Sequence, residues 1–263
     1  MDETVVLKIG GGYLHDNKPP ATPREKMINL ACRLVDYLNS HSQMRLVVVV
    51  GGRRTITCPE ECNSDTEKNA PPRLSFKEFA HESDQLGMLL SVANAATLNI
   101  VFNAVFNLAR KSSPTKTNRR AFLLNSFGVG GDLGEDYSVS RAKELLDDGH
   151  VVIIGGGTGQ SGLTTDFAAV CRATELGASP LLTITHEQPG VIDGTELMGY
   201  DRFYTLLRPD LFDSVAARLA EQKGLSIFIF NPNMTARSSR NGFSDNLIAA
   251  IDDHRDMVGT LIS

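Results

Sequence analysis

The chain has 263 residues, of which 41% are hydrophobic and 22% are charged, a composition typical of a soluble globular protein with a sizeable core. Its formal net charge of −5 at pH 7 argues against a dedicated nucleic-acid-binding protein, which is usually basic. No run of about 18 apolar residues is present and the start MDET has no basic segment, so we expect no membrane-spanning helix, no signal peptide and a cytoplasmic location.

Short apolar runs alternate with helical patterns along the first half of the chain. The β-branched runs over 4–9 and 45–50 are too continuous for half-exposed strands and indicate a parallel sheet that is covered on both faces. Between them, apolar residues at helical spacing after Pro23 predict a helix. A second helix is predicted over about 78–96, and a strand over 121–124.

The second half continues the same alternation. Helices are predicted over 138–148 and 165–176, each followed by a glycine C-cap, and a further helix opens at Pro209 and ends at Gly224. The strands predicted in this half are 150–154, 180–185, 225–230 and 258–262. This order of elements predicts an α/β protein, a three-layer α/β/α sandwich with a mostly parallel central sheet.

Three polar segments are predicted to be loops, over 55–75, 110–120 and 232–245. The middle segment, RKSSPTKTNRR, is basic and could bind a phosphate-bearing effector or a partner, although a solvated loop is the simpler interpretation.

The four cysteines do not form a recognisable metal-binding pattern. Cys32 and Cys171 lie in helical patterns and are expected to be small buried residues. Cys58 and Cys62 lie in a polar segment with no second Cys/His pair at zinc-finger spacing, so we expect free thiols there.

Three glycine clusters follow predicted strands, with the sequences KIGGG over 8–12, VVGGRR over 49–54 and IGGGTGQSG over 154–162. Ligands of open parallel sheets bind beyond the carboxyl ends of the strands. Glycine lets the backbone approach a ligand closely and present bare N–H groups, and a following helix N-terminus favours negative charge. The three clusters together therefore suggest an anionic ligand, most simply phosphate. None of them matches a P-loop, and a Rossmann dinucleotide site is disfavoured.

Charged residues beside these clusters narrow the chemistry. Lys8 ends the first strand, where a lysine is costly unless it points toward an anion, and it could neutralise charge on a transferring phosphoryl group. Asp166 opens a helix beside the third cluster. It could simply favour the helix dipole, with Thr165 as the N-cap, or it could hold Lys8 and a metal while the threonines bind substrate. Phosphoryl transfer depends mainly on positioning and charge stabilisation, so this short set of groups can suffice.

The segment GHVVIIGGGTGQSGLTTDFAAVCRATELGA (149–178) resembles the signature of bacterial-type uridylate (UMP) kinases in the amino acid kinase family. The resemblance extends to VVLKIGGG, to DQLGMLLSVANA (84–95), to 210–231 and to VGTLI at the end. It implies one domain over 1–263, with an acceptor half over about 1–165 and a donor half over about 166–263. It also implies a kinase of pyrimidine metabolism that transfers the ATP γ-phosphoryl to UMP with Mg²⁺, and a homo-oligomer, usually a hexamer, without nucleic-acid or membrane partners.

The resemblance also implies roles for individual residues. Lys8 would stabilise the transferring phosphoryl group, Asp166 would orient Lys8 and the metal, and Asp213 completes the catalytic set. Asp84 would bind the acceptor ribose hydroxyls. The other acceptor-binding residues would be Gly11, Gly12, Gly51, Gly52, Arg53, Thr158, Gln160 and Thr165, and the ATP-binding residues would be Gly10, Thr185, His186 and Asp193.

Several positions depart from the family pattern. The first loop reads KIGGG instead of K-L-S-G-E, and Gln160 replaces an asparagine. Thr183 stands where the family has a lysine, and QPGVIDGTE replaces the donor motif D-G-V-Y-D-x-D-P. Two alternatives therefore stay open: a kinase of another small acceptor, and a non-catalytic nucleotide- or oxyanion-binding protein resembling molybdate storage proteins or regulatory pseudokinases. A kinase is favoured by the presence of all four expected residues, which are Lys8, Asp84, Asp166 and Asp213.

Overall fold

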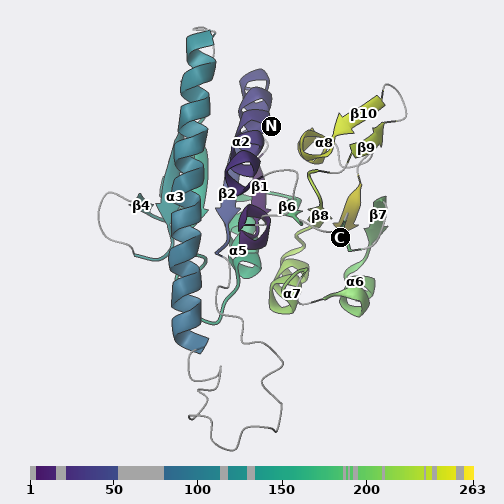
Figure 1. Ribbon diagram of the computed structural model, residues 1–263. Helices are drawn as coiled ribbons and strands as arrows, with labels where there is room; N and C mark the ends of the chain where they lie inside the picture. The colour runs from purple at the N-terminus through teal and green to yellow at the C-terminus, as the bar shows by residue number, and fades with distance from the viewer. Residues whose placement is uncertain are drawn as a thin grey trace, which may run out of the picture.

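The computed structural model describes residues 4–15, 22–52, 80–112, 118–128, 134–185, 188, 190–191, 195–208, 211–233, 235–238, 242–252 and 258–263. Its central feature is a nine-stranded sheet (Figure 1). The strands of this sheet are β1 (Thr4–Ile9), β2 (Arg45–Val50), β3 (Ala121–Asn125), β4 (Glu135–Asp136), β5 (Val151–Gly155), β6 (Leu181–Ile184), β7 (Thr195–Met198), β8 (Ile227–Phe230) and β11 (Gly259–Ile262). A separate two-stranded antiparallel sheet pairs β9 (Thr235–Ser238) with β10 (Gly242–Asp245).

The strands of the large sheet follow the order β4-β3-β5-β2-β1-β6-β8-β11-β7. Every neighbouring pair in this order is parallel except β8 and β11, which are antiparallel. Because β1, β2 and β5 are neighbours and run in the same direction, their carboxyl ends meet at one edge of the sheet. The predicted mostly parallel sheet is therefore confirmed.

Helices cover both faces of the sheet (Figure 1). The helices are α1 (Gly11–His15), α2 (Pro23–Ser40), α3 (Ala80–Ser112), α4 (Val139–Asp147), α5 (Thr165–Leu176), α6 (Tyr200–Leu206), α7 (Ser214–Lys223) and α8 (Asn246–Asp252). Side chains of β1 alternate between two apolar cores: Leu7 belongs to the core that includes residues of α1, α2, α3 and α8, whereas Val6 belongs to the core that includes residues of α4, α5, α6 and α7. The α/β/α sandwich follows from this alternation, as predicted.

Two predicted helix boundaries are wrong, each for a local reason. The helix predicted over 78–96 runs to Ser112, because buried Leu98 and Phe102 continue its apolar face. The helix predicted from Pro209 begins at Ser214, where the Asp213 carboxylate accepts hydrogen bonds from two backbone N–H groups of the first turn.

The segments predicted to be loops have different outcomes. Residues 232–245 contain the β9–β10 hairpin, whose polar sequence gave no strand signal. Residues 110–112 belong to α3, and 55–75 lie outside the described residues together with Cys58 and Cys62. Cys32 and Cys171 are free thiols in α2 and α5, and both are half-buried instead of fully buried.

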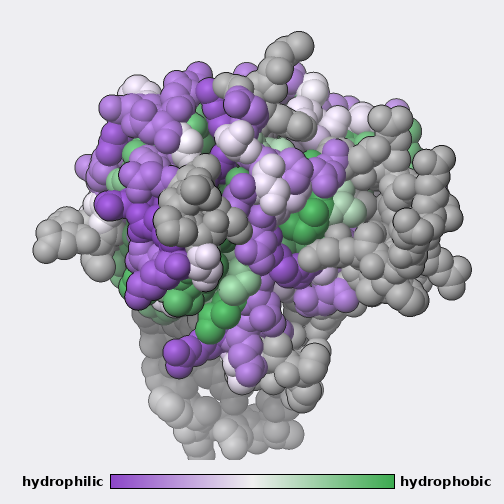
Figure 2. All heavy atoms as spheres, turned by 90° about the horizontal axis from the view of Figure 1, so that it is seen from above, coloured by the Kyte–Doolittle hydropathy of each residue, from purple (hydrophilic) through white to green (hydrophobic). Residues whose placement is uncertain are grey.

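Residues Ser83–Ser112 of α3 are long and apolar enough to cross a membrane, by length and composition. The core helix of a soluble protein passes the same test, and α3 packs against β2, β3 and β5 of the sheet. Seen from above, hydrophilic residues cover most of the described surface and hydrophobic ones gather in a few small areas (Figure 2). A single helix of this kind is weak grounds for a membrane protein.

Candidate active site

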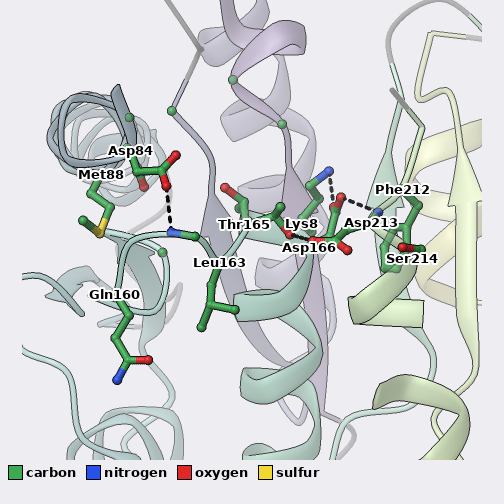
Figure 3. A pocket seen from close by; sticks show the side chains of 18 of the residues that line it. Lys8, Asp84, Met88, Gln160, Leu163, Thr165, Asp166, Phe212, Asp213 and Ser214 are labelled. Carbon is green, nitrogen blue, oxygen red and sulfur yellow. Dashed lines mark hydrogen bonds and ion pairs between the residues drawn. The ribbon is translucent and has the colours of Figure 1, made fainter. Parts of the chain in front are cut away.

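A cavity of about 860 Å³ lies where β1, β2 and β5 end, within the size range of small-molecule sites. Its walls come from the glycine-rich strand ends, the first turns of α3 and α5, and the region around α6 and α7. Figure 3 shows Asp84 and Met88 on one side and Phe212, Asp213 and Ser214 on the other.

An ion pair lies in the middle of this cavity. Lys8, the next-to-last residue of β1, places Nζ 2.6 Å from Oδ1 of Asp166 in the first turn of α5 (Figure 3). The two side chains are only 10% and 14% exposed. A low-dielectric setting strengthens this attraction, and it holds the ammonium group at a fixed point of the cavity wall. Gly10 has no side chain that could cover this ammonium. A Cβ added there would lie 3.7 Å from Nζ, in van der Waals contact with it.

Asp213 supports the pair from α7. Its backbone N–H donates to Oδ2 of Asp166 over 3.1 Å. Its own carboxylate accepts hydrogen bonds from the Thr164 hydroxyl at 2.5 Å and from the Val215 N–H at 2.7 Å. The Asp213 carboxylate is thus held by protein groups, which makes it a positioning residue in this arrangement.

The N-cap of α5 is Thr164, whose hydroxyl accepts a hydrogen bond from the Phe167 N–H at 3.2 Å. Thr165, the residue interpreted as a possible N-cap, is the first residue of the helix. The Thr165 hydroxyl therefore does not cap the helix. It lies beside Gly51, since a Cβ added to Gly51 would be 3.1 Å from the Thr165 hydroxyl oxygen. Thr165 therefore lines the cavity at the junction of the first two glycine clusters.

The glycines of the second cluster allow close packing around the cavity. The Gly51 N–H donates to the Ile9 carbonyl at 2.8 Å, which joins the ends of β1 and β2. A Cβ on Gly52 would lie 1.9 Å from the Gly87 carbonyl oxygen of α3, closer than any real contact. Gly52 is therefore required for the approach of α3, in addition to any role toward a ligand.

Two buried polar residues of α3 tie the glycine loops together. The Ser91 hydroxyl donates to the Val50 carbonyl at 2.6 Å and accepts from the Gly156 N–H at 2.9 Å. The Asn94 side chain donates to the Gly51 carbonyl at 2.9 Å. The sequence analysis did not predict a role for either residue. Two polar side chains on the apolar face of a predicted helix would have indicated buried hydrogen bonds.

The third glycine loop, between β5 and α5, is shaped by left-handed glycines. Gly159 has φ of +79°, and a Cβ there would lie 2.2 Å from the Ser126 carbonyl oxygen. Oδ2 of Asp84 accepts a hydrogen bond from the Gly162 N–H at 2.7 Å, which links α3 to this loop (Figure 3). The Gln160 N–H donates to the Thr158 hydroxyl at 3.2 Å, and the Gln160 side chain extends away from Lys8 (Figure 3).

The wall opposite Asp84 comes from α6 and α7, and includes Tyr204, Leu207, Phe212 and Arg218. The Tyr204 hydroxyl donates to Oε2 of Glu221 at 2.7 Å. Burial, followed by this hydrogen bond, raises the pKa of Tyr204 to about 12. Tyr204 is therefore a neutral phenol at physiological pH, and it adds a polar group beside the apolar Leu207 and Phe212.

The structure brings most of the predicted site residues together. Those that line the cavity are Lys8, Gly10, Gly11, Gly52, Asp84, Gln160, Thr165, Asp166 and Asp213. The predicted residues that do not line it are Gly12, Gly51, Thr158 and Thr185. Thr185 instead follows β6 and donates a hydrogen bond to the Gln188 carbonyl at 2.5 Å. Arg53, His186 and Asp193 lie outside the described residues.

A divalent cation would find few protein ligands here. Among the described residues no group of three or more His, Cys, Asp or Glu side chains is arranged to hold a metal. Mg²⁺ commonly binds through one or two carboxylates together with substrate phosphates. The Asp166 and Asp213 carboxylates fit that pattern, provided that a phosphorylated ligand supplies the remaining oxygens.

Comparison with known proteins points to one family. The model of the amino acid kinase family matches residues 3–196. A uridylate kinase of Mycoplasma mobile is 26% identical over 242 residues, covering 86% of this chain and 88% of that protein. A uridylate kinase of Deinococcus radiodurans is 28% identical over 240 residues, covering 88% of this chain and 87% of that protein.

Solved structures agree on the fold. The crystal structure of UMP kinase from Ureaplasma parvum matches with a TM-score of 0.72 at 20% identity, covering 100% of both chains. That of UMP kinase from Bacillus anthracis matches with a TM-score of 0.71 at 22% identity, covering 99% of this chain and 96% of that one.

Proposed function

The chain belongs to the amino acid kinase family, and on this premise we propose that it is a nucleoside monophosphate kinase that transfers the γ-phosphoryl group of ATP to UMP, giving UDP and ADP. The observation that carries the proposal is the Lys8–Asp166 ion pair, which lies where three glycine-lined strand ends meet. The uridylate kinases that match most of the chain support UMP as the acceptor.

Lys8 has the central part in the proposed reaction. Its ammonium group, held by Asp166, stabilises the negative charge that spreads over the phosphoryl group during transfer. Asp213 and Thr164 keep Asp166 in place through the hydrogen bonds between α5 and α7. Asp166 and Asp213 are the carboxylates that would hold a bound Mg²⁺, and the ion would further neutralise the charge of the donor phosphates.

The acceptor is proposed to bind on the α3 side. Asp84 lines the cavity and has one carboxylate oxygen committed to Gly162, so its other oxygen can accept a hydrogen bond from a ribose hydroxyl. Thr165 and Gln160 line the cavity as well, and the Gln160 N–H donates a hydrogen bond to the Thr158 hydroxyl. Gly52 at the end of β2, with Arg53 following it in the sequence, is proposed to hold the acceptor phosphate.

We further propose that the protein is a cytoplasmic homo-oligomer. Apolar side chains recur at helical spacing along one exposed side of α3, which we call the outer α3 stripe: Leu86, Leu89, Ile100 and Leu108. A row of large exposed apolar residues on one helix face is typical of a contact between subunits. This surface supports self-association of the chain.

The test of the proposed function is a coupled assay of ADP release with ATP and Mg²⁺, run in parallel with UMP, with CMP and without acceptor. We expect release that depends on UMP and that is lost in Lys8→Ala and in the near-isosteric Asp166→Asn. Tight ATP binding without turnover for any acceptor would instead identify a nucleotide-binding protein on a kinase fold. ADP release with another acceptor alone would refute UMP as substrate.

A further inference from the structure

The described wall of the cavity has little positive charge for a site that must hold two nucleotides. Its cationic side chains are Lys8 and Arg218, and its carboxylates are Asp84, Asp166 and Asp213. Lys8 is already paired with Asp166 at 2.6 Å. The triphosphate of ATP and the phosphate of UMP bring several negative charges, so each remaining cation on this wall matters.

The strand next to Lys8 does not add a cation. Thr183 of β6 lies in parallel register with Lys8 of β1 and is fully buried. Its hydroxyl has no hydrogen-bond partner among the described residues, and it carries no charge. Thr185, which follows β6, is also neutral and donates its hydroxyl hydrogen to a backbone carbonyl.

At the N-termini of α5 and α7, beside the cavity, some of the backbone N–H groups that could bind an anion already have hydrogen-bond partners. The Asp213 carboxylate accepts hydrogen bonds from Val215 and Ala216, so a carboxylate already occupies the N-terminus of α7. At the N-terminus of α5, the Thr164 hydroxyl binds the Phe167 N–H in the same way. A phosphate on this side therefore needs a side-chain cation.

Arg218 meets this requirement. It lies four residues after Ser214, so both project from the same side of α7, and both line the cavity. Its side chain is exposed, and within the described part of the chain no ion pair or hydrogen bond engages its guanidinium. Tyr204 lines the same wall, and the positive charge of Arg218 lowers the pKa of Tyr204 against the effects of burial and Glu221.

We propose that Arg218 binds the phosphate tail of the donor nucleotide, an inference that rests on the proposed kinase function. The assignment to donor over acceptor follows from position, because Asp84 and Met88 lie across the Lys8–Asp166 pair from the start of α7 (Figure 3). The planar guanidinium offers several donors that match phosphate oxygens. Leu207 and Phe212 on the same wall provide apolar surface for the nucleoside part.

The first test is calorimetric titration of the full chain with ATP, ADP and AMP in Mg²⁺. We expect Arg218→Ala to weaken ATP binding about 10-fold, ADP binding less and AMP binding hardly at all, as for loss of one charge-assisted contact to the outer phosphates. Arg218→Lys should keep part of the ATP affinity, because it retains the charge without the planar fork. Lys223→Ala, an exposed cation at the end of the same helix, is the matched control and should bind like the parent.

Steady-state kinetics supply the second readout. The KM for ATP should rise about 10-fold in Arg218→Ala, with the KM for UMP unchanged. An equal loss for AMP and ATP, or a change confined to the UMP KM, would overturn the assignment to the donor phosphates. A parent protein that neither binds ATP nor turns over UMP would contradict the proposed function itself, whereas an active parent matched by Arg218→Ala in every titration would contradict the Arg218 inference alone.

Discussion

The hydroxyl of Thr164 donates a 2.5 Å hydrogen bond to Oδ2 of Asp213, and thereby joins the N-cap of α5 to the N-cap of α7. The two residues are 49 positions apart in the sequence. Asp213 in turn donates its backbone N–H to Asp166, which holds Lys8. The ammonium group at the centre of the cavity is thus positioned by a chain of contacts that ends in a threonine outside the ion pair.

Replacement of Thr164 tests this chain of contacts. Thr164→Ala removes both the cap of α5 and the bond to Asp213, so we expect the free energy of unfolding to fall by about 1 kcal/mol and kcat to fall at least several-fold. Thr164→Ser keeps the hydroxyl and should retain most of both. Urea denaturation and the ADP-release assay measure the two effects. A Thr164→Ala protein with normal kcat would show that the chain of contacts serves stability only.

Asp84 has two proposed roles that a pair of substitutions can separate. Asp84→Asn keeps an oxygen that can accept from the Gly162 N–H, but it removes the negative charge, whereas Asp84→Ala removes both. If the carboxylate binds the acceptor ribose, both variants should raise the KM for UMP, by about 10-fold in Asp84→Ala, and leave the KM for ATP nearly unchanged. Normal kinetics in Asp84→Asn with a defect in Asp84→Ala would mean that Asp84 only holds the glycine loop.

The sequence predicted the parts of the site whose signals are local. The boundaries of β1 and β2 follow from their β-branched runs, and the place of the Lys8–Asp166 pair follows from their positions at a strand end and a helix start. Glycines after three strands predicted an anion site, and the cavity lies there. In each of these cases a few adjacent residues carry the whole pattern.

The parts that the sequence did not reveal depend on contacts between distant segments. Ser91 and Asn94 look like ordinary helix residues until the fold places them against the ends of β2 and β5. Arg218 looks like a solvated position of an amphipathic helix until the fold places the first turns of α7 beside the cavity. The requirement for Gly52 comes from the approach of Gly87, a residue of another element.

Substitution of Gly52 tests how closely α3 packs against the end of β2. A Cβ at this position would meet the Gly87 carbonyl oxygen at 1.9 Å, so Gly52→Ala must displace α3 or the end of β2. We expect a loss of about 2 kcal/mol in the free energy of unfolding, together with weaker UMP binding. Gly128→Ala is the control, since no atom lies within 4 Å of its added Cβ, and it should unfold like the parent. Equal stability of the two variants would contradict the tight packing.

The outer α3 stripe predicts how subunits associate. Ile100 is 70% exposed and Leu108 is 62% exposed in the single chain, so a charge at either position should cost little within one subunit. If the stripe lies between subunits, Ile100→Glu would bury an unpaired carboxylate in the contact. The oligomer should then dissociate toward smaller species. Light scattering after size-exclusion chromatography measures the mass, with Val215→Glu on α7, 56% exposed, as a control at another site. An unchanged mass for Ile100→Glu would rule out the stripe as a subunit contact.

His150 gives the fold a dependence on pH. Burial, followed by the charges of Arg120, Arg119 and Arg141, lowers its pKa below the ordinary value of 6.5, although Asp148 opposes the shift. Nδ1 accepts a hydrogen bond from the Arg120 N–H at 3.3 Å, which requires the neutral ring. The folded state therefore binds this proton less readily than the unfolded chain. The contribution to stability is present above about pH 6.5 and is lost as the pH falls from there through the lowered pKa.

His150→Asn tests this dependence, because asparagine offers an oxygen near the position of Nδ1 but does not titrate. In urea denaturation at several pH values between about 8 and 5, the parent should lose about 1 kcal/mol more than His150→Asn on going to the acidic end, the worth of one hydrogen bond. The difference should arise below the ordinary histidine pKa and not above it, because the neutral ring is shared by the folded and unfolded states at higher pH. Parallel losses in the two proteins would assign the acid sensitivity to other groups.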